Sequence, residues 1–512
     1  MKYSFKHNAQ IREKVDAMDA EQLLRMVVCP QVANGDDVPR ATGAAFIHPK
    51  TTDEACAIAK KINDEREMSA LIVSDMEFGP GDAIKGAVKF PSMRAVAETG
   101  DPSLAYQMGE IAAKQARSAG YHWTFGPCVD IVLNPYNPIV TTRSPGETAD
   151  AVIEYGGAYV DGLQENGLIA TLKHFPGDGC SLSDQHITTT ANPLSREQWD
   201  ETYGRVYKAL IDRGAMTIMA GHIALPAYDE PDQYGLYPPA TMSKNLLTGL
   251  LREKLGFEGL IVSDACNMGG FCGYMNFYRG CCEFLKAGGD CLLFVRDTDE
   301  YLTEMKQYLA DGTLPMDVLK DRAYRLLCFA NDYFEKFPAG DVSSIDLEKA
   351  EACAKTVAQK AVKITRDREG LLPLKIKENS KIAHAILHPT WLTDFSCPME
   401  VSERLSKYAE VETLVDPGGG TLREMAKSGK YDYIICSVLE MGVYGTNTAR
   451  LVGPAARNMM SGWMRYGTPV VFIGYGNPYF ALTYDHSVDT IINTFGYTEY
   501  TAEAVVKRLL EG

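Results

Sequence analysis

The sequence predicts an α/β protein in two parts, a (β/α)8 TIM-like barrel followed by a smaller, doubly wound α/β domain. About eight short apolar runs recur through roughly the first 300 residues, separated by longer stretches with helical periodicity, which is the pattern of such a barrel. A second series of apolar runs begins near residue 382, after a segment containing Pro, Gly and Ser. We therefore expect a barrel domain over 1–336, a linker over 337–345 and a C-terminal α/β sandwich domain over 346–512.

Each run of the first series is short enough to be a single buried strand. Helical stretches between the runs give the alternation of strand and helix that closes a parallel barrel. The runs that we interpret as barrel strands cover residues 24–29, 43–47, 71–74, 122–126, 168–172, 216–220, 260–263 and 290–295.

Beyond the linker, a helix and five apolar runs indicate the second domain. One helical face carries Leu347, Ala350, Ala354, Val357, Ala361 and Ile364. The runs that alternate with further helical stretches cover residues 382–387, 411–415, 433–438, 470–473 and 488–492. This alternation is typical of a small doubly wound sheet. The glycine-rich run 416–420 lacks the lysine and the spacing of a phosphate loop, so we interpret it as a turn.

Composition narrows the class of partner. The 512 residues carry a formal charge of −16 with a pI near 5.1, which argues against nucleic acid and anionic membranes as partners. No apolar run approaches the length of a membrane span, and we recognise no signal peptide at the start. Thirteen cysteines occur without a Cys-x-x-Cys pair, so we expect a reducing, cytoplasmic location.

The most informative stretch follows the run 168–172. Residues 173–179 read Lys-His-Phe-Pro-Gly-Asp-Gly, and 184–186 read Asp-Gln-His. A cation, two imidazoles and two carboxylates are thus gathered around a Pro-Gly turn at the exit of a strand. Active sites of barrel enzymes lie at this end of the strands, and ionisable groups seldom gather without a function.

Asp264 is the first candidate for a nucleophile, because it ends the apolar run 260–263 and would point to the active face of a barrel. Its position alone equally allows helix N-capping. A metal-dependent hydrolase could also use His174, His186, His222 and the nearby carboxylates. Such sites typically carry a His-x-His pair on the first strand, which is absent here, so we expect neither a metal nor another cofactor.

The stretch 173–186 resembles the signature of glycoside hydrolase family 3, most closely its β-N-acetylglucosaminidase branch. That signature runs Lys-His-Phe/Ile-Pro-Gly-His-Gly, then four residues, then Asp-Ser/Thr-His. Asp178 and Gln185 depart from it, standing in place of His and of Ser or Thr. Similar family motifs occur at 71–79, 126–131, 143–144, 239–243, 255–265, 371–374 and 476–479.

The resemblance implies roles for the candidate residues. Asp264 would attack the sugar, and His186, oriented by Asp184, would be the acid and base. Imidazole suits this task because it titrates near neutrality. The positions that would bind sugar hydroxyls are Asp75, Arg143, Lys173 and His174. The implied substrate is a small amino-sugar glycoside, cleaved with retention through a covalent glycosyl-enzyme.

One departure leaves the substrate open. The family usually carries sugar-binding arginines just after the 71–79 motif, where this chain has Pro-Gly-Asp-Ala-Ile-Lys at 80–85. The alternatives are a β-glucosidase or β-xylosidase, a glycosyl phosphorylase of the same family, and an inactive sugar-binding relative. The presence of Asp264 together with the Asp184/His186 pair argues against the inactive relative.

Overall fold

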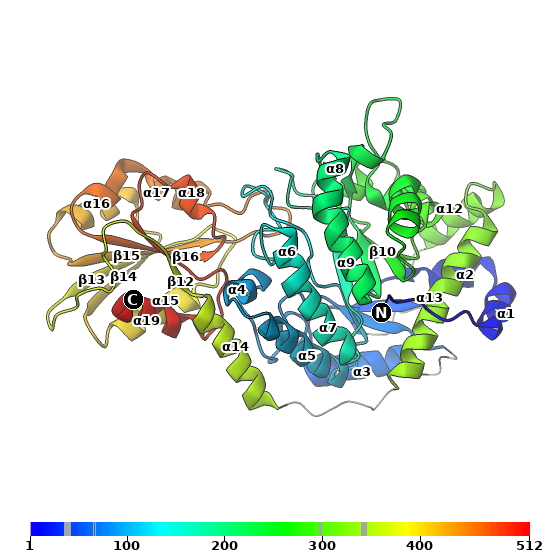
Figure 1. The fold of residues 1–512 in the computed structure, drawn as a ribbon, viewed down its shortest axis with the longest axis horizontal. Coiled ribbons are helices and arrows are strands. Elements are labelled where there is room, and N and C mark those ends of the chain that lie inside the picture. Colours follow the sequence, from blue (N-terminus) through cyan, green and yellow to red (C-terminus); the bar gives the residue numbers. More distant parts are fainter. Residues whose placement is uncertain (1, 35–41, 65, 67, 296–298, 339–345) are drawn as a thin grey trace. The chain divides into compact units, whose positions relative to one another are not determined.

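The computed structural model describes residues 2–34, 42–64, 66, 68–295, 299–338 and 346–512 (Figure 1). The chain divides into two compact units. Unit 1 comprises Met1–Val88, Ala105–Asn134 and Gly146–Leu347, and unit 2 comprises Lys89–Leu104, Pro135–Pro145 and Glu348–Gly512. Most of the expected linker, residues 339–345, lies outside the described residues.

Unit 1 is a ring of parallel strands, which confirms the predicted barrel. One sheet has the order β2-β3-β4-β5 and the other β1-β11-β10-β8-β6. A bridge from Trp123 to Ile169 joins β5 to the chain entering β6, and only Pro30 separates β1 from β2. The bounds are β1 Val28–Cys29, β2 Gln31–Val32, β3 Ala44–Ile47, β4 Leu71–Ser74, β5 Trp123–Thr124, β6 Thr171–Phe175, β8 Thr217–Ala220, β10 Leu260–Ala265 and β11 Cys291–Leu293, with β7 Thr190–Ala191 and β9 Ile223–Ala224 as a separate pair.

Helices connect the strands and cover the outside of the ring. Figure 1 shows α3, α5, α7 and α9 as successive neighbours. A Cβ at Gly162 would lie 2.1 Å from the Tyr106 carbonyl oxygen, so α5 and α7 pack backbone against backbone. The bounds are α1 Ala9–Ala17, α2 Ala20–Met26, α3 Thr52–Asn63, α5 Pro102–Ser118, α6 Ala149–Ala151, α7 Gly157–Glu165, α8 Arg196–Trp199, α9 Arg205–Arg213, α10 Gly269–Cys272, α11 Phe277–Ala287, α12 Asp299–Ala310 and α13 Met316–Lys336.

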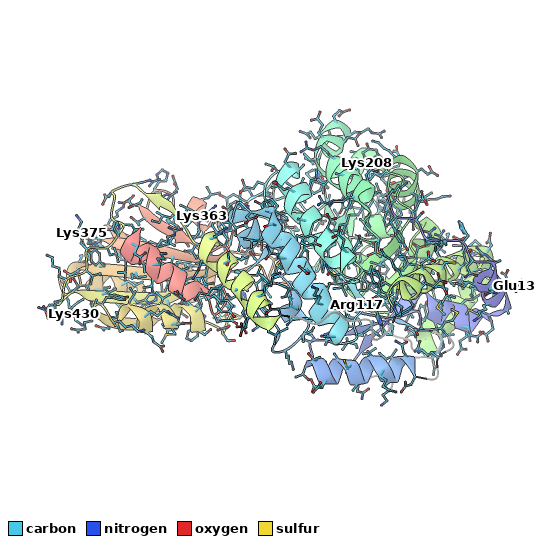
Figure 2. The ribbon with its side chains drawn as sticks, turned by 60° about the horizontal axis from the view of Figure 1, so that its bottom comes forward. Glu13, Arg117, Lys208, Lys363, Lys375 and Lys430 are labelled. Atoms are coloured by element: carbon cyan, nitrogen blue, oxygen red, sulfur yellow. The ribbon has the colours of Figure 1, made fainter. Side chains whose placement is uncertain are left out.

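The outer face of α9 carries charged residues. Along α9, Val206, Tyr207 and Leu210 are buried, whereas Lys208 is exposed and lies among the surface side chains (Figure 2). This spacing is that of an amphipathic helix packed on a core. Among the described residues, no helix is both long enough and apolar enough to cross a membrane.

Most predicted runs match the strands to within three residues, and two differ in a way that bears on the prediction. The first run, 24–29, is helical at its start, because a capping box between Asp19 and Gln22 begins α2, which buries Leu23 and Leu24. Only Val28–Cys29 forms a strand. The run 168–172 is shifted: β6 extends to Phe175 and therefore includes the first part of the polar motif. Helices and strands are both apolar where they are buried, so a short apolar run does not by itself distinguish the two.

Unit 2 contains a doubly wound sheet of order β12-β17-β16-β15-β13-β14. The five predicted runs form its parallel strands in the order 2-1-3-4-5, a common order for such sheets. Their bounds are β13 Lys381–Leu387, β14 Glu410–Val415, β15 Tyr433–Glu440, β16 Val470–Gly476 and β17 Thr490–Asn493. The sequence did not predict β12 Lys363–Asp367, which pairs antiparallel with β17. Ile364 therefore belongs to this edge strand and not to the helix α14 Leu347–Ala361.

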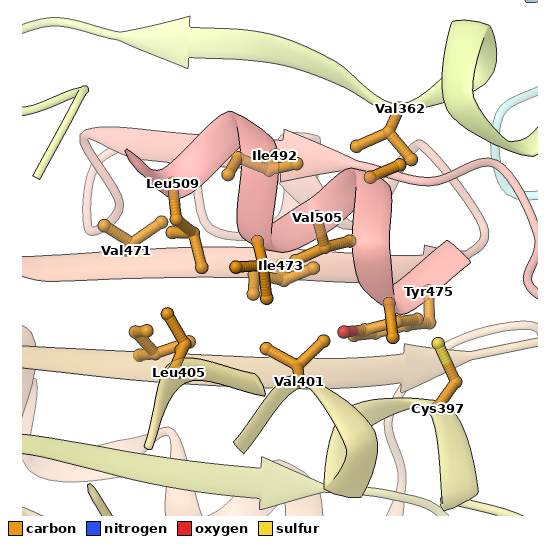
Figure 3. Close-up of a cluster of buried hydrophobic side chains, with 14 of the residues drawn as sticks. Val362, Cys397, Val401, Leu405, Val471, Ile473, Tyr475, Ile492, Val505 and Leu509 are labelled. Atoms are coloured by element: carbon orange, nitrogen blue, oxygen red, sulfur yellow. The ribbon is translucent and has the colours of Figure 1, made fainter. Parts of the chain in front are cut away.

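Helices pack on both faces of this sheet. On one face, α15 Ser396–Leu405 and α19 Thr501–Glu511 enclose a core that includes Val401, Ile473 and Val505 (Figure 3). The other face is covered by α16 Gly419–Lys427 and α17 Gly453–Asn458, with Trp463 and Phe472 in its core. The short helices α4 Met93–Glu98 and α18 Phe480–Thr483 also belong to unit 2.

Candidate active site

Asp264 lies at the carboxyl end of β10, between β8 and β11 in the parallel sheet of unit 1. Residues 260–264 are buried, so the carboxylate leaves a rigid strand. The next helix, α10, has Met268 at its N-cap position, which removes the capping alternative for Asp264. Its Oδ1 instead accepts a hydrogen bond of 2.7 Å from the Ala265 N–H.

The surroundings of Asp264 favour its charged form. Burial acts to raise the pKa of this carboxyl group, but the neighbouring imidazoles, His174 first, and the Ala265 N–H outweigh it, so the pKa is lowered. The His174 Nε2 lies 3.9 Å from Asp264 Oδ2. An ionised carboxylate fixed at a strand end is suited to nucleophilic attack.

His174 is held on β6 by the fully buried Asp130. The Asp130 Oδ2 is 2.8 Å from His174 Nδ1, and its Oδ1 accepts hydrogen bonds from the N–H groups of His174 (3.2 Å) and Asp178 (2.7 Å). Burial raises the pKa of Asp130, but His174 and these hydrogen bonds leave it lowered overall. With Nδ1 donating to the carboxylate, Nε2 is the ring nitrogen turned toward Asp264.

Lys173 is bound by two acids from the turn after β4. Its Nζ lies 2.6 Å from Glu77 Oε1 and 3.3 Å from Asp75 Oδ1. The lysine and glutamate side chains are 5% and 12% exposed, whereas that of Asp75 is 50% exposed. Asp75 therefore exposes part of its carboxylate to solvent, whereas Lys173 and Glu77 are mostly buried.

Asp184 and His186 form a close pair on the loop after β6. The Asp184 Oδ1 is 2.6 Å from His186 Nδ1 and also accepts the His186 N–H at 2.9 Å. Asp184 is buried, while the His186 side chain is 25% exposed. The loop is bonded to the start of α10, since Gly269 N–H donates to the His186 carbonyl (2.8 Å) and Gly270 N–H to the Gln185 carbonyl (3.1 Å).

Gln185 and His222 link this loop to the ends of β8 and β10. The Gln185 Oε1 accepts the His222 N–H at 2.8 Å. The His222 Nε2 lies 3.0 Å from the Ala265 carbonyl oxygen, and its Nδ1 3.1 Å from Thr241 Oγ1. Burial lowers the pKa of His222, so the neutral ring donates to Ala265 and accepts from Thr241. His222 therefore has a structural role beside Asp264, the candidate nucleophile.

Two glycines give the motif its shape. Gly177 and Gly179 have φ of +121° and +96°. A Cβ at Gly177 would lie 2.2 Å from the Tyr203 ring, and one at Gly179 would lie 2.1 Å from the Ile131 carbonyl oxygen. Only glycine combines this backbone conformation with such close packing. The turn carrying Asp178 is therefore fixed against the chain that supplies Asp130.

The structure thus brings together six of the seven predicted site residues in unit 1. The seventh, Arg143, lies on the segment Pro135–Pro145 of unit 2, and its role stays a prediction. The sequence interpretation overlooked Asp130 and Glu77 as site residues. Glu77 lies three residues after the run 71–74 and Asp130 four residues after the run 122–126, and this position near a strand exit could have identified them.

Within the described residues, Cys128, Asp130 and His174 have possible ligand atoms within 4.8 Å of one another. The thiol lies 3.2 Å from the Asp130 carboxylate, and the His174 ring 2.8 Å from it. The three side chains therefore satisfy each other through hydrogen bonds.

Sequence comparison gives the chain's relatives. Residues 14–329 match the family described as "Glycosyl hydrolase family 3 N terminal domain". The chain is 28% identical over 492 residues to a β-N-acetylglucosaminidase/β-glucosidase of Cellulomonas fimi, covering 91% of this chain and 86% of that protein. It is 29% identical over 259 residues to a β-hexosaminidase of Nitrosomonas eutropha, covering 49% of this chain and 72% of that protein.

Solved structures share the fold over almost the full length. The β-glucoside phosphorylase BglX superposes with a TM-score of 0.90 at 25% identity, covering 100% of this chain and 95% of that one. A family 3 β-N-acetylglucosaminidase from Paenibacillus sp. str. FPU-7 superposes with a TM-score of 0.80 at 21% identity, covering 96% and 97%.

Proposed function

Since this chain belongs to glycosyl hydrolase family 3 and is therefore a glycosidase, we propose that it is a retaining exo-enzyme that releases terminal β-linked N-acetylglucosamine. Its substrate would be a small amino-sugar glycoside, and its own side chains would supply the chemistry without a cofactor. The reaction would use Asp264 as nucleophile and His186, held by Asp184, as acid and base.

In the first step the Asp264 carboxylate attacks the anomeric carbon. A bond forms from this carbon to the aspartate oxygen as the glycosidic C–O bond breaks, and the leaving oxygen takes a proton from the His186 imidazolium. In the second step the neutral imidazole accepts a proton from water. The resulting nucleophile displaces Asp264, and the sugar leaves with its original anomeric configuration.

The observation that carries this proposal is the Asp184–His186 pair, at 2.6 Å, on a loop bonded to the segment just after Asp264. Buried Asp184 fixes the Nδ1 proton and leaves Nε2 for exchange with a substrate. Asp75 directly follows β4 and contacts Lys173, which lies with His174 on β6. These three side chains would bind hydroxyl groups, with Arg143 as a further donor.

The names of two relatives support the amino sugar, since one is a β-N-acetylglucosaminidase/β-glucosidase and the other a β-hexosaminidase. Phosphorolysis is the second candidate. The BglX phosphorylase superposes over this whole chain, and an imidazole that has given up its proton is neutral, so it would not repel phosphate as a carboxylate base would.

A panel of aryl β-glycosides of N-acetylglucosamine, glucose and xylose, with and without phosphate, tests the substrate and the reaction together. We expect the N-acetylglucosaminide to react fastest and phosphate to have no effect. A phosphate-dependent rate with a sugar 1-phosphate product would establish phosphorolysis. Sugar binding without turnover in any assay would identify an inactive relative.

A 2-fluoro or 5-fluoro glycoside tests the nucleophile, because it traps the covalent intermediate. We expect the label on Asp264, and Asp264→Asn should abolish turnover while the fold persists. A label on another carboxylate, or nearly normal turnover of the Asn variant, would reject the assignment.

We also propose a cytoplasmic location. All thirteen cysteines lie in the described part of the chain and all are free thiols, as expected in a reducing compartment.

A further inference from the structure

The turn at 75–79 is the part of unit 1 that carries the acids bound to Lys173. It leaves β4 and leads into a short 3-10 helix, Pro80–Asp82. Glu77 and Asp75 bind the Lys173 ammonium at 2.6 and 3.3 Å, and Lys173 directly precedes His174. The backbone of this turn therefore sets the positions of Asp75 and Glu77 and, through them, of Lys173, whose neighbour His174 lies 3.9 Å from Asp264.

Three side chains from outside the turn fix its backbone, the first being Thr124, whose Oγ1 accepts the Met76 N–H at 2.9 Å. The Asp82 Oδ2 accepts the Phe78 N–H at 2.8 Å. The buried Tyr159 hydroxyl, on α7, donates to the Met76 carbonyl at 2.7 Å and accepts the Gly79 N–H at 3.3 Å. Backbone groups of Met76, Phe78 and Gly79 are thereby hydrogen-bonded, and side chains that support a loop in this way hold its shape.

We propose that Asp82 is a positioning residue for sugar binding, whose carboxyl group holds the 75–79 turn so that Asp75 and Glu77 fix Lys173 and Asp75 faces the substrate. This inference rests on the proposed function, because it assigns Asp75 and Lys173 to the sugar site. It also gives a role to the run 80–85, where the family's usual arginines are absent.

The charges around Asp82 make this role sensitive to pH. Asp75 and Glu77 share the Lys173 ammonium group, and Asp82 is a third acid that interacts electrostatically with both. Burial, and then the charges of Glu77 and Asp75, raise the pKa of Asp82 to about 7. The other titratable group packed here is the Tyr159 hydroxyl, whose pKa burial raises far above its usual value, so it remains neutral.

The sign of the effect follows from these charges. Below pH 7 Asp82 is neutral and adds no repulsion to Asp75 and Glu77. As the pH rises through 7, Asp82 ionises and repels both acids, which loosens the turn. Sugar affinity should therefore fall as the pH rises through this value.

The experiment compares Asp82→Ala, which loses the acceptor of the Phe78 N–H, with Asp82→Asn, which keeps an acceptor and cannot ionise. The matched control is Asp53→Asn, at an exposed position in the first turn of α3. The readouts are KM and kcat for the best substrate, and the Kd for N-acetylglucosamine and for glucose by calorimetry, each from pH 5.5 to 8.5.

We expect Asp82→Ala to raise KM and Kd about tenfold, the effect of losing one hydrogen bond to a carboxyl group, with little change in kcat. Asp82→Asn should bind as the wild type does at pH 6 and should lose the fall in affinity above pH 7. Wild-type Kd values in both variants, or an unchanged pH dependence in Asp82→Asn, would overturn the role of Asp82. If the wild type binds neither sugar and cleaves no glycoside, the proposed function itself fails.

Discussion

At the scale of single residues, Asp264 and His186 have environments suited to different chemistry. Asp264 is only 9% exposed and its pKa is lowered, so it is ionised throughout the neutral range. The His186 side chain is 25% exposed while its partner Asp184 is fully buried. A ring that reaches solvent from a fixed carboxylate can exchange protons in each catalytic cycle, whereas a buried carboxylate can remain a nucleophile.

The proton-transfer role of His186 gives a prediction that depends on the leaving group. His186→Ala should slow substrates with poor leaving groups by about 10²–10⁴-fold, and activated aryl glycosides far less, because their leaving oxygen hardly needs a proton. Asp184→Asn should show the same pattern more mildly, since the ring remains but loses its orientation. Steady-state rates across a series of leaving-group pKa values measure both effects.

Azide provides the control for this prediction. It attacks the glycosyl-enzyme without needing a base, so it should partly restore turnover in His186→Ala. Equal losses for all leaving groups, with no effect of azide, would remove His186 from the mechanism. A carboxylic acid would then have to donate the proton, as in the β-glucosidase alternative.

Residues at strand exits were predictable because polar groups there interrupt an otherwise apolar run, as Lys173 and Asp264 do. Asp130 and Glu77 also lie near strand exits, but their pairing with His174 and Lys173 could not be predicted, because it joins strands that are distant in sequence. His222 was noticed without a role, and the hydrogen bonds to Ala265 and Gln185 explain it. The sequence carries no signal for such contacts.

At the scale of elements, Asp290 ties β10 to two helices at the end of the barrel where β10 begins. It is completely buried. Its carboxylate contacts Arg252 at 2.6 Å, Arg325 at 2.9 Å and Arg322 at 3.3 Å, and it accepts the Ile261 N–H at 2.8 Å. The strand that carries Asp264 is thus anchored at its start by a buried ion cluster.

Removing the Asp290 charge should destabilise unit 1. We expect Asp290→Asn to lower the free energy of unfolding by about 3–5 kcal/mol, because it removes the counter-charge of the mostly buried Arg252 and Arg325 side chains. Asp321→Asn is the matched control, since Asp321 contacts the same Arg322 at 3.6 Å from an exposed position, where the loss should be under about 1 kcal/mol. Urea unfolding measures both, and equal effects would contradict the anchoring role.

The stability that Asp290 contributes should decrease at acidic pH. Burial raises the pKa of Asp290, but the three arginines leave it below the ordinary 3.8. Its stabilising contribution is therefore present above pH 3.8 and is lost as the pH falls through the folded-state pKa. The difference between the wild type and Asp290→Asn should disappear in the same range.

Elements were predicted well where an apolar run is also a strand, as at 260–263. The prediction failed where an apolar run is not a single strand, or where a strand is not an apolar run. The run 24–29 contains the buried end of helix α2 and the buried strand β1. Strand β12 was missed because its residues are only partly buried. An edge strand has one paired side, so its sequence need not be a continuous apolar run.

At the scale of the whole molecule, unit 2 is not a simple C-terminal domain. It includes Lys89–Leu104 and Pro135–Pro145, which the sequence interpretation placed within the barrel domain. Ala95 packs with Ala361 and Phe495, and the Arg450 guanidinium lies 3.7 Å from the centre of the Tyr136 ring. Contacts between segments so distant in sequence leave no local signal, so the boundary at 336 could mark only where the chain leaves the last barrel helix.

The presence of these two segments in unit 2 predicts the outcome of limited proteolysis. We expect the first cut within 337–345, where Pro, Gly and Ser favour an exposed connection, giving one fragment on each side. The fragments should nevertheless elute together in gel filtration and separate only in denaturant, because the first fragment contains Lys89–Leu104 and Pro135–Pro145, which complete unit 2. Replacing both Arg450 and Tyr136 by Ala should make the nicked protein separate at a lower urea concentration than the nicked wild type, since their cation–π contact contributes about 0.5–2 kcal/mol.

If the fragments separate without denaturant and residues 346–512 remain folded alone, the two segments are dispensable and the C-terminal region is an independent domain. If the first cuts fall within the first three hundred residues and leave no stable barrel fragment, the expected linker is misplaced.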